Sequence, residues 1–330
     1  MELELEMIRA SVDEIVAGSA VGRMQRKALT VAALCVGGAA AAVAIRASAA
    51  RRARGVVCST WRYLWMRWKL RRADRLVIIT DFDRTVTTAY AADGSAGASS
   101  HGILESCSAL SAAYRKKATA LLAHYHPIEL DPALTIAEKL PIMQEWYHKA
   151  HTLLAEQPIT MALIADAVAE SKVLIRPGLV EMLARAEARG VPFIAYSAGL
   201  GNVVAEVLRQ QLGDAGARVP VVANLLLFDG PGGRVSGFGD LIHMYNKTGE
   251  RVRERVDPAL LAGRTVALVM GDGLGDATMA DGLGMEVVRV GLINQKEAAE
   301  QDSRLPSYSA TFDCVLLGDT SFDFVNELLG

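Results

Sequence analysis

The sequence predicts an α/β protein whose parallel sheet is covered by helices on both faces and carries a helical insertion after its first strand. Three observations predict this. Short apolar segments suited to buried strands recur after residue 75. Amphipathic helical stretches separate several of them, and strands that alternate with helices are typical of a parallel sheet. Residues 89–173 break the alternation, because they combine a loop rich in Gly, Ser and Ala with helical segments only.

Size and composition fit a folded protein of one large or two modest domains. The chain has 330 residues, of which 51% are apolar and 22% are charged. A formal net charge of −2 gives no indication of nucleic acid binding, and we expect no nucleic acid partner. The four cysteines are scattered along the chain, which argues against a zinc site or a disulfide framework and favours a reducing compartment.

The first 75 residues are expected to form an extension outside the catalytic part. Ala28–Ile45 is uncharged and, at about 18 residues, reaches the lower limit for a membrane-spanning helix. About ten Lys and Arg residues follow between Arg46 and Arg75, together with three tryptophans suited to a membrane interface. We therefore predict membrane association through residues 28–72. The alternatives are a cleaved targeting peptide and an Ala-rich helix packed on the protein.

The first strand of the predicted sheet, Leu76–Thr80, leads directly into two carboxylates, Asp81 and Asp83. Residues i and i+2 of a strand face the same way, so we expect both side chains in one small space. Two like charges this close require a cation or a shared proton. Parallel α/β sheets bind ligands at the carboxyl ends of their strands. The pattern predicts a metal-assisted site; the alternative is a strand followed by an Asp-rich turn.

The insertion over residues 89–173 is expected to form a cap above this site. It opens with the loop Ala91–Gly102 and continues with helices predicted at Ile103–Tyr125, Thr135–Ala155 and Ile159–Glu170. Residues 76–88 and 174–330 are then expected to form the catalytic core. Its further strands are predicted at Val191–Tyr196, Val219–Leu227, Thr265–Met270, Met285–Val290 and Asp313–Leu317, with helices at Leu179–Arg189 and Asn202–Leu212.

Three further motifs follow the later strands. Ser197, followed by Ala198, offers a hydroxyl and free N–H groups to an anion, although Ser and Gly populate many ordinary turns. Lys247 would matter only if it reached a phosphate as a point charge, since most lysines are solvated. Asp272 and Asp276 lie in a Gly-rich turn and are hard oxygen ligands of the kind that Mg²⁺ prefers; the alternative is an Asp-Gly turn.

The order of these motifs resembles the four-motif signature of haloacid dehalogenase (HAD) phosphatases, whose core is a three-layer, Rossmann-like parallel sheet. From about Leu76 to the C-terminus the chain also resembles the cytosolic pyrimidine 5′-nucleotidase family (5′-nucleotidase type III), which has a 7-methylguanosine-phosphate-specific branch. This resemblance rests on longer stretches, namely Ile128–Pro132, Glu138–Pro141, Glu145–Tyr147, Ser197–Gly199, Leu241–His243, Met279–Gly282 and Val290–Asn294.

The resemblance implies a mechanism. Asp81 would be the nucleophile that becomes an aspartyl-phosphate, and Asp83 the general acid that protonates the leaving group and then activates water. Asp81 and Asp272 would ligate Mg²⁺ directly. Asp276 would support that shell, and the backbone carbonyl of Asp83 would add a ligand.

The resemblance also implies how the substrate is held. Ser197 and the Ala198 N–H would hold the phosphoryl oxygens, and Lys247 would neutralise their charge. Glu129 would contact the base, since a carboxylate accepts the exocyclic amine of cytosine or guanine. Ala150 departs from the serine expected to line the nucleotide pocket, which could redirect substrate choice.

The function implied is that of a Mg²⁺-dependent, cytoplasmic 5′-nucleotidase that hydrolyses pyrimidine nucleoside monophosphates such as CMP and UMP. A phosphoenzyme could also pass its phosphoryl group to another nucleoside. Two alternatives stay open. One is a HAD phosphatase for another small phosphomonoester, either 7-methyl-GMP or phosphoserine. The other is a catalytically silent, membrane-tethered binding protein.

Overall fold

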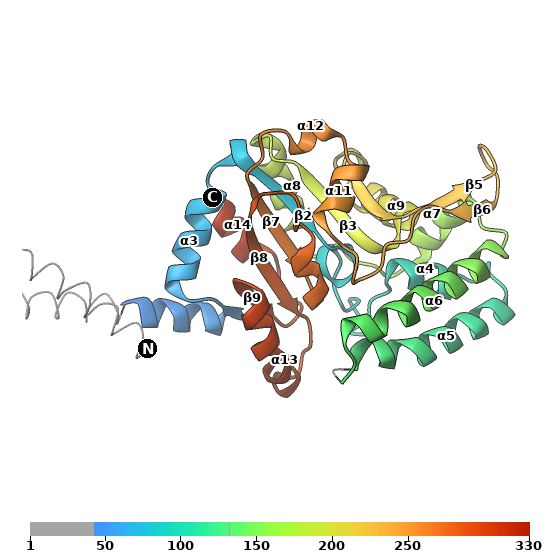
Figure 1. Cartoon of the computed structure of the whole chain (residues 1–330), viewed down its shortest axis with the longest axis horizontal. Helices are drawn as coiled ribbons and strands as arrows, with labels where there is room; N and C mark the ends of the chain where they lie inside the picture. Colours follow the sequence, from blue (N-terminus) through green and yellow to red (C-terminus); the bar gives the residue numbers. More distant parts are fainter. Residues whose placement is uncertain (1–42, 132) are drawn as a thin grey trace, which may run out of the picture. The chain divides into compact units, whose positions relative to one another are not determined.

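The computed structural model describes residues 43–131 and 133–330, and the chain divides into two compact units, Met1–Trp61 and Arg62–Gly330 (Figure 1). Most of the predicted membrane segment, residues 28–42, lies outside the described residues. Within the described part of the chain, no helix is long and apolar enough to cross a membrane. The membrane association predicted for residues 28–72 therefore stays a prediction.

The described part of the first unit is a helix over residues 43–53 followed by the short strand β1 (Val56–Val57). Arg51 ties the helix to the segment after β1. Its guanidinium donates hydrogen bonds to Thr60 Oγ1 at 2.8 Å and to the Cys58 carbonyl at 3.3 Å. Thr60 Oγ1 in turn donates to the Ala44 carbonyl at 2.8 Å. These hydrogen bonds hold the helix against the segment that contains Cys58 and Thr60.

The second unit is built on a parallel sheet whose strands stand in the order β9-β8-β7-β2-β3-β4. The strands are β2 (Leu76–Thr80), β3 (Phe193–Leu200), β4 (Val221–Asn224), β7 (Val266–Gly271), β8 (Glu286–Ile293) and β9 (Cys314–Leu317). Every residue of β2 and β7 is buried, as in a parallel sheet covered on both faces. The chain leaves β2 for β3 and β4 on one side and returns to β7 on the other. Ligands bind at such a switch point, here between β2 and β7.

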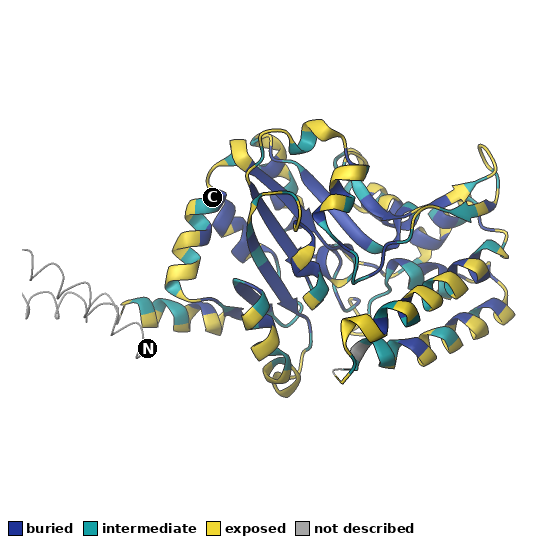
Figure 2. Ribbon diagram, viewed as in Figure 1, coloured by how far each residue is buried: buried dark blue, intermediate teal, exposed yellow. Residues whose placement is uncertain are grey.

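Helices cover both faces of the sheet and confirm the predicted fold class. They are α3 (Thr60–Leu70), α8 (Leu179–Ala188), α9 (Gly201–Leu212), α10 (Asp214–Ala217), α11 (Gly249–Arg255), α12 (Pro258–Leu261), α13 (Ala298–Thr311) and α14 (Asp323–Leu329). Figure 1 shows α11 and α12 in front of the sheet and α8 and α9 behind it. Val77 and Ile79 of β2 belong to one buried cluster with Val252 of α11. Figure 2 shows the strands buried and the helices exposed on their outer sides.

A helical insertion separates β2 from β3, as the sequence predicts. It contains α4 (Ser100–Ser106), α5 (Ala112–Leu130), α6 (Ile136–Ala155) and α7 (Met161–Glu170). The single helix predicted over residues 103–125 is wrong, because residues 107–111 separate α4 from α5. The Ser111 side chain accepts a hydrogen bond from the Tyr114 N–H and so begins a new helix. At the start of α6, Thr135 and Glu138 form a capping box.

One predicted strand, residues 219–227, is also wrong, since the chain breaks after Asn224. The Asn224 side chain accepts a hydrogen bond from the Ile242 N–H and donates to the Ile242 and Ala198 carbonyls, at 2.7 to 2.8 Å. The residues beyond it form β5 (Leu226–Phe228), which pairs antiparallel with β6 (Val235–Phe238). A buried amide that bridges three segments thus ends β4 and anchors the loop that leads to Lys247.

Candidate active site

Asp81 lies directly after the central strand. Its N–H donates to the Met270 carbonyl of β7 at 2.8 Å, which fixes the backbone at the switch point of the sheet. The strand itself ends at Thr80, and residues 82–86 form a turn in which Asp83 and Arg84 have non-helical backbone angles. Asp81 and Asp83 therefore do not alternate along one strand, and this prediction is wrong. A turn, and not an extended strand, presents the two carboxylates.

This turn contains an unfavourable backbone conformation at Arg84, which side chains from other segments stabilise. Arg84 has φ of +63°, a left-handed conformation that is unfavourable for a residue with a side chain. Its carbonyl accepts hydrogen bonds from Arg176 Nη2 at 2.7 Å and from Asn294 Nδ2 at 2.8 Å. The buried Arg176 guanidinium also donates to the carbonyls of Thr85 and Thr87. Arg176 therefore holds the loop that carries the two aspartates.

Lys247 is the central cation of the site. Its ammonium donates to Asp81 Oδ1 and to Asp276 Oδ1, both at 2.6 Å, and its side chain is 2% exposed. Burial alone would lower the pKa of Lys247, but the carboxylates of Asp276 and Asp81 outweigh it and raise the pKa above its ordinary value. Lys247 is thus a permanent positive charge fixed beside Asp81.

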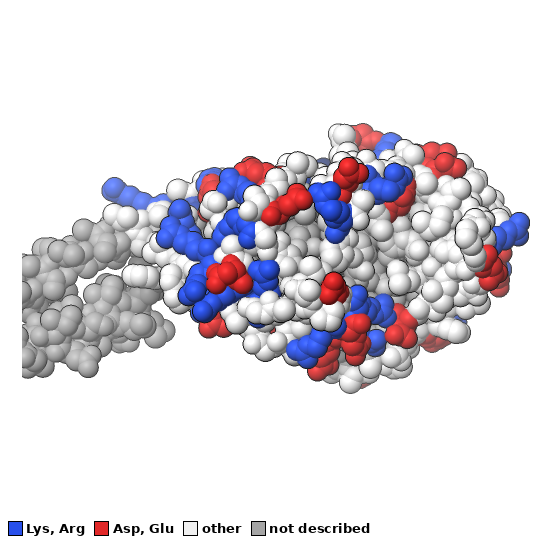
Figure 3. Space-filling view, turned by 90° about the horizontal axis from the view of Figure 1, so that it is seen from above, with Lys and Arg blue, Asp and Glu red and all other residues white. Residues whose placement is uncertain are grey.

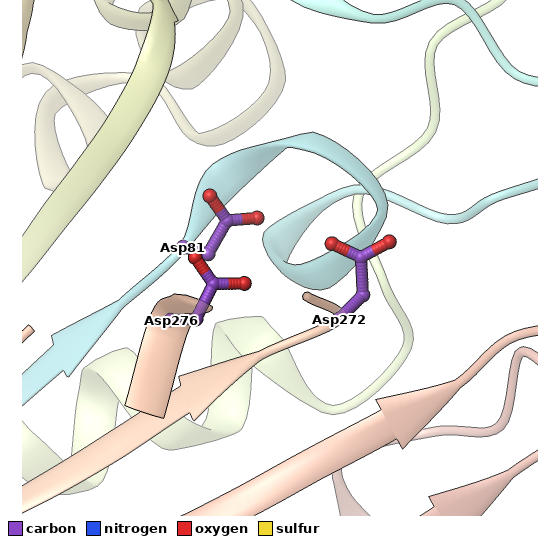
Figure 4. Close-up of side chains that lie close together, drawn as sticks. All are labelled: Asp81, Asp272 and Asp276. Carbon is purple, nitrogen blue, oxygen red and sulfur yellow. The ribbon is translucent and has the colours of Figure 1, made fainter. Parts of the chain in front are cut away.

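Three carboxylates meet at this point, as Figure 4 shows for Asp81, Asp272 and Asp276. One ligand oxygen from each lies within 4.8 Å of the others. Asp276 uses both oxygens within the protein, since Oδ2 accepts the Gly273 N–H at 2.8 Å and Oδ1 accepts Lys247. Among the described residues, none donates a hydrogen bond to the Asp272 carboxylate. A β-carbon on Gly271 would lie 2.2 Å from Asp276 Cβ, so only glycine permits this approach.

The charge balance of the cluster fits a divalent cation. Burial, opposed by Lys247 and reinforced by Asp276 and Asp272, raises the pKa of Asp81 above its ordinary value. Burial and the Asp276 charge raise the pKa of Asp272 to about 7. Protonation of these carboxylates is favoured because the positive charge around them is too small to balance their negative charges. A bound cation would supply the missing charge, and carboxylate oxygens are the hard donors that Mg²⁺ selects. The donor set therefore fits Mg²⁺.

Asp83 is held apart from this cluster by the first residue of the cap helix α4. Its Oδ1 accepts the Ser100 N–H and its Oδ2 the Ser100 hydroxyl, both at 2.7 Å. Burial raises the pKa of Asp83, although the two bonds from Ser100 oppose the shift. A β-carbon placed on Gly199 would lie 1.8 Å from Ser100 Oγ, 2.9 Å from Asp83 Oδ2 and 3.0 Å from Ser197 Oγ. Gly199 thus leaves the room in which these three polar groups meet.

Ser197 and Ala198 lie within β3, not after it, because this strand continues to Leu200. The register between β3 and β4 shifts between Tyr196 and Leu200, which frees the backbone at these residues. Ser197 is buried, and its hydroxyl accepts the Gly199 N–H at 2.9 Å. The structure therefore brings Ser197 beside Asp83, at the carboxyl end of the strand next to β2.

On the cap, the pKa of Tyr147 of α6 responds to the charges of both the predicted base-contacting residue and the carboxylates. Burial raises the pKa of Tyr147 above its ordinary value, and the charges of Glu129, Asp83 and Asp81 add to the shift while Lys247 opposes it. Its hydroxyl therefore lies within the electrostatic reach of both groups. Burial also raises the pKa of Glu129, at the end of α5.

Ala150 lies elsewhere. With Trp146, Glu105 and Leu153 it lines a cavity of about 20 Å³ within the cap, which none of the catalytic carboxylates lines. The Trp146 ring stacks on Tyr125, with centroids 5.7 Å apart and planes 11° apart. Ala150 and Trp146 therefore take part in the packing of the cap. The structure does not bring Ala150 to the carboxylates.

Sequence reasoning missed Ser100, Arg176 and Gly199 as parts of the site. Ser100 falls in a loop of Gly, Ser and Ala that shows no periodicity. Arg176 is the one charged residue in the short segment Val173–Pro177 and could have been noted as a cation next to apolar neighbours. Gly199 followed Ser197 in the predicted turn, but only the structure shows which side chains surround it.

Comparisons with known proteins agree on one group. The model of the pyrimidine 5′-nucleotidase (UMPH-1) family matches residues 85–330. The human 7-methylguanosine phosphate-specific 5′-nucleotidase is 38% identical over 259 residues, which cover 78% of this chain and 84% of that protein. The Drosophila melanogaster protein of the same name is 34% identical, with 78% and 79% covered. Cytosolic 5′-nucleotidase IIIB bound to cytidine superposes with a TM-score of 0.75 at 30% identity, covering 86% of this chain and 95% of that one.

Proposed function

The chain belongs to the pyrimidine 5′-nucleotidase (UMPH-1) family, and from this premise we propose that it is a Mg²⁺-dependent phosphohydrolase of nucleoside 5′-monophosphates that acts through an aspartyl-phosphate on Asp81. Its HAD-type fold and its membership of a 5′-nucleotidase family make it an enzyme of this class. The observation that carries the proposal is the buried Lys247, which bridges Asp81 and Asp276 beside Asp272.

The first step follows from the position of Asp81. Among the described residues, only Lys247 donates a hydrogen bond to this carboxylate, and it does so at Oδ1. Oδ2 is therefore the oxygen left to attack phosphorus. The Oδ2–P bond forms while the bond from phosphorus to the nucleoside 5′-oxygen breaks. Lys247 and the Ser197 hydroxyl would hold the charged phosphoryl oxygens during this transfer.

Asp83 handles the proton in both steps. In the first it gives its proton to the departing 5′-oxygen, so that the nucleoside leaves neutral. In the second it takes a proton from the water that attacks phosphorus, and phosphate leaves as Asp81 is restored. Burial raises the pKa of Asp83, which supports a role that begins from the protonated form. An acceptor nucleoside in place of water would give phosphotransfer.

Asp81 and Asp272 would hold Mg²⁺, with the backbone carbonyl of Asp83 as a further ligand. Asp276 would act indirectly, since Lys247 and the Gly273 N–H occupy its two oxygens. When bound, Mg²⁺ would supply positive charge to the transferring phosphoryl group. The same charge would favour the ionised form of Asp81.

Glu129 provides a reason to rank the candidate nucleotide substrates by their bases. A carboxylate accepts a hydrogen bond from the exocyclic amine of cytosine or 7-methylguanine, whereas uracil presents a carbonyl oxygen at the corresponding position. We therefore propose CMP among the pyrimidine nucleotides, ahead of UMP. The second candidate is 7-methyl-GMP, which is supported by similarity to relatives named for that substrate. By its similarity to cytosolic 5′-nucleotidase IIIB, the catalytic part is proposed to act in the cytosol.

The test is phosphate release by the full chain from CMP, UMP, 7-methyl-GMP, AMP and phosphoserine, with Mg²⁺ and with a chelator. We expect Mg²⁺-dependent release led by CMP or 7-methyl-GMP. Release led by UMP would contradict the role of Glu129, and release led by phosphoserine would contradict a nucleotide-binding cap. No release from any substrate by a folded chain would contradict the enzymatic proposal and favour a binding protein.

A further inference from the structure

Helix α3, none of whose side chains belongs to the carboxylate site, exposes a continuous apolar face. Trp61, Leu64, Trp65 and Trp68 are 65%, 50%, 38% and 65% exposed. Their spacing of i, i+3, i+4 and i+7 places them in one row along the helix. We name this row the tryptophan stripe. So many large rings on one exposed row are unusual, because isolated apolar side chains are the normal case on a protein surface.

The opposite face of α3 is already used. Met66 and Leu70 are fully buried, and the Tyr63 ring packs against Phe324 with centroids 5.9 Å apart. At about 100° per residue, these three side chains lie on the side of the helix away from the stripe. The helix is therefore fixed to the protein by one face, and the stripe is left to contact something else.

Basic side chains flank the stripe on both edges. The same helical geometry places Arg62 and Lys69 along one edge and Arg67 along the other. The Lys69 ammonium lies 4.8 Å from the centroid of the Trp68 ring. The helix has no acidic residue, and the exposed Arg71 and Arg72 follow it. Figure 3 shows Lys and Arg side chains gathered in one region of the face drawn, with acidic side chains among them.

We propose that α3 lies flat on an anionic lipid surface, with the tryptophan stripe at the boundary between headgroups and acyl chains. Trp and Leu on one face with Lys and Arg beside them is the pattern of interfacial helices. Tryptophan favours the headgroup level, because its ring is apolar and its N–H is polar. Each Lys or Arg near an anionic leaflet adds electrostatic attraction, which salt weakens. Lys69 is paired with Glu286, so the charges that select an anionic surface are those of Arg62, Arg67 and Arg71.

This docking surface does not depend on the proposed catalytic function. None of the side chains of the stripe or its edges belongs to the carboxylate site. Phosphate release can therefore serve as an independent measure of folding in the variants. A chain that binds vesicles but hydrolyses nothing, or the reverse, separates the two proposals.

The experiment is co-sedimentation of the full chain with vesicles of phosphatidylcholine alone and of phosphatidylcholine mixed with phosphatidylserine. We expect binding to the mixed vesicles, weakened by salt, and at least about tenfold weaker binding for Trp65→Ser combined with Trp68→Ser. Three of the four tryptophans of the chain lie on α3, so a blue shift of fluorescence should accompany binding. The fourth, Trp146, stacks inside the cap.

The matched control replaces two exposed apolar side chains on other helices, Leu122→Ser with Val180→Ser, which are 44% and 65% exposed in the wild type. This control should bind as the wild type does. Equal binding by the stripe variant and the wild type would overturn the proposal, as would equal binding to both vesicle types. Self-association of the chain that depends on the stripe, without vesicle binding, would assign the face to a protein contact instead.

Discussion

The carboxylate site and the inner face of the cap hold their side chains in different ways. At the sheet, charged groups are fixed by short bonds to named partners, as Lys247 is between Asp81 and Asp276. On α6, rings contact rings: His151 stacks on Phe238 with centroids 4.3 Å apart and meets Tyr147 edge to face at 5.9 Å. One region is an ionic network, and the other is a set of neutral aromatic surfaces.

This difference separates chemistry from substrate choice. Ionic bonds of 2.6 Å leave little freedom, so a change there alters the placement of reacting groups. Stacked rings tolerate changes of shape and act on a substrate mainly through contact area and desolvation. Substitutions at the sheet should therefore reduce the rate for all substrates, whereas those on the cap should change preference or stability.

The largest effect is expected for Asp81→Asn. The amide keeps the shape of the side chain but cannot attack phosphorus, so phosphate release should fall by a factor on the order of 10⁴ or more with every substrate. Circular dichroism should show an unchanged fold. The matched control is Asp281→Asn, an exposed carboxylate paired with Arg289 on the surface, which should keep full activity. Activity within tenfold of the wild type would contradict the assignment of the nucleophile.

A smaller effect is expected at Asp83 and depends on the leaving group. Asp83→Asn removes the acid and should slow the release of a nucleoside by about 10² to 10⁴. p-Nitrophenyl phosphate needs little protonation of its leaving group and should lose much less. Ser100→Ala should show the same selectivity at lower amplitude, because it removes the hydroxyl bond to Asp83 Oδ2 while the backbone N–H still donates to Oδ1. Equal losses on both substrates would rule out the proton-transfer role.

The parts of the site that could be predicted from sequence are those carried by single strands. Asp81 and Asp272 each lie in a short motif next to an apolar strand, and the parallel sheet brings strand ends together. The family resemblance is confirmed, and so is the parallel sheet with its helical insertion. In these cases a local pattern and a general rule of topology suffice.

The parts that could not be predicted depend on contacts between distant segments. Ser100 reaches Asp83 only because α4 folds back onto the turn after β2, and Arg176 reaches Arg84 across a separation of 92 residues. The end of β4 at Asn224 likewise depends on a side chain that binds another loop. Such bonds leave no periodicity and no motif in the sequence.

On the cap, Glu129→Gln tests substrate choice. The amide removes the acceptor charge and can donate to a carbonyl oxygen, so kcat/KM for CMP and 7-methyl-GMP should fall by about 10- to 100-fold while UMP changes little. The measurement is phosphate release from the three nucleotides under the same conditions. A uniform loss on all three would place Glu129 in the chemistry and would blur the distinction between the two regions.

The smallest effect is a change of stability with pH at His151, which should leave the chemistry untouched. Burial, aided by the neighbouring His101 and His148, lowers the pKa of His151 to about 3, from 6.5 in the unfolded chain. Below pH 6.5 the unfolded chain therefore binds a proton that the folded chain does not, and stability falls as the pH drops. Between pH 7 and pH 5 this amounts to about 1 to 2 kcal/mol.

His151→Phe should remove that loss. The ring can keep the stacking on Phe238, and the substitution deletes a buried Nε2 that has no hydrogen-bond partner among the described residues. Urea unfolding at pH 7 and pH 5 should show a smaller difference for the variant than for the wild type, and no loss of stability at pH 7. His148→Gln, on the exposed side of the same helix, should keep the wild-type difference. If His151→Phe showed the same difference in stability between pH 7 and pH 5 as the wild type, the prediction would be wrong. His151 would then be protonated in the folded state at pH 5, and this face of the cap would carry charge as the carboxylate site does.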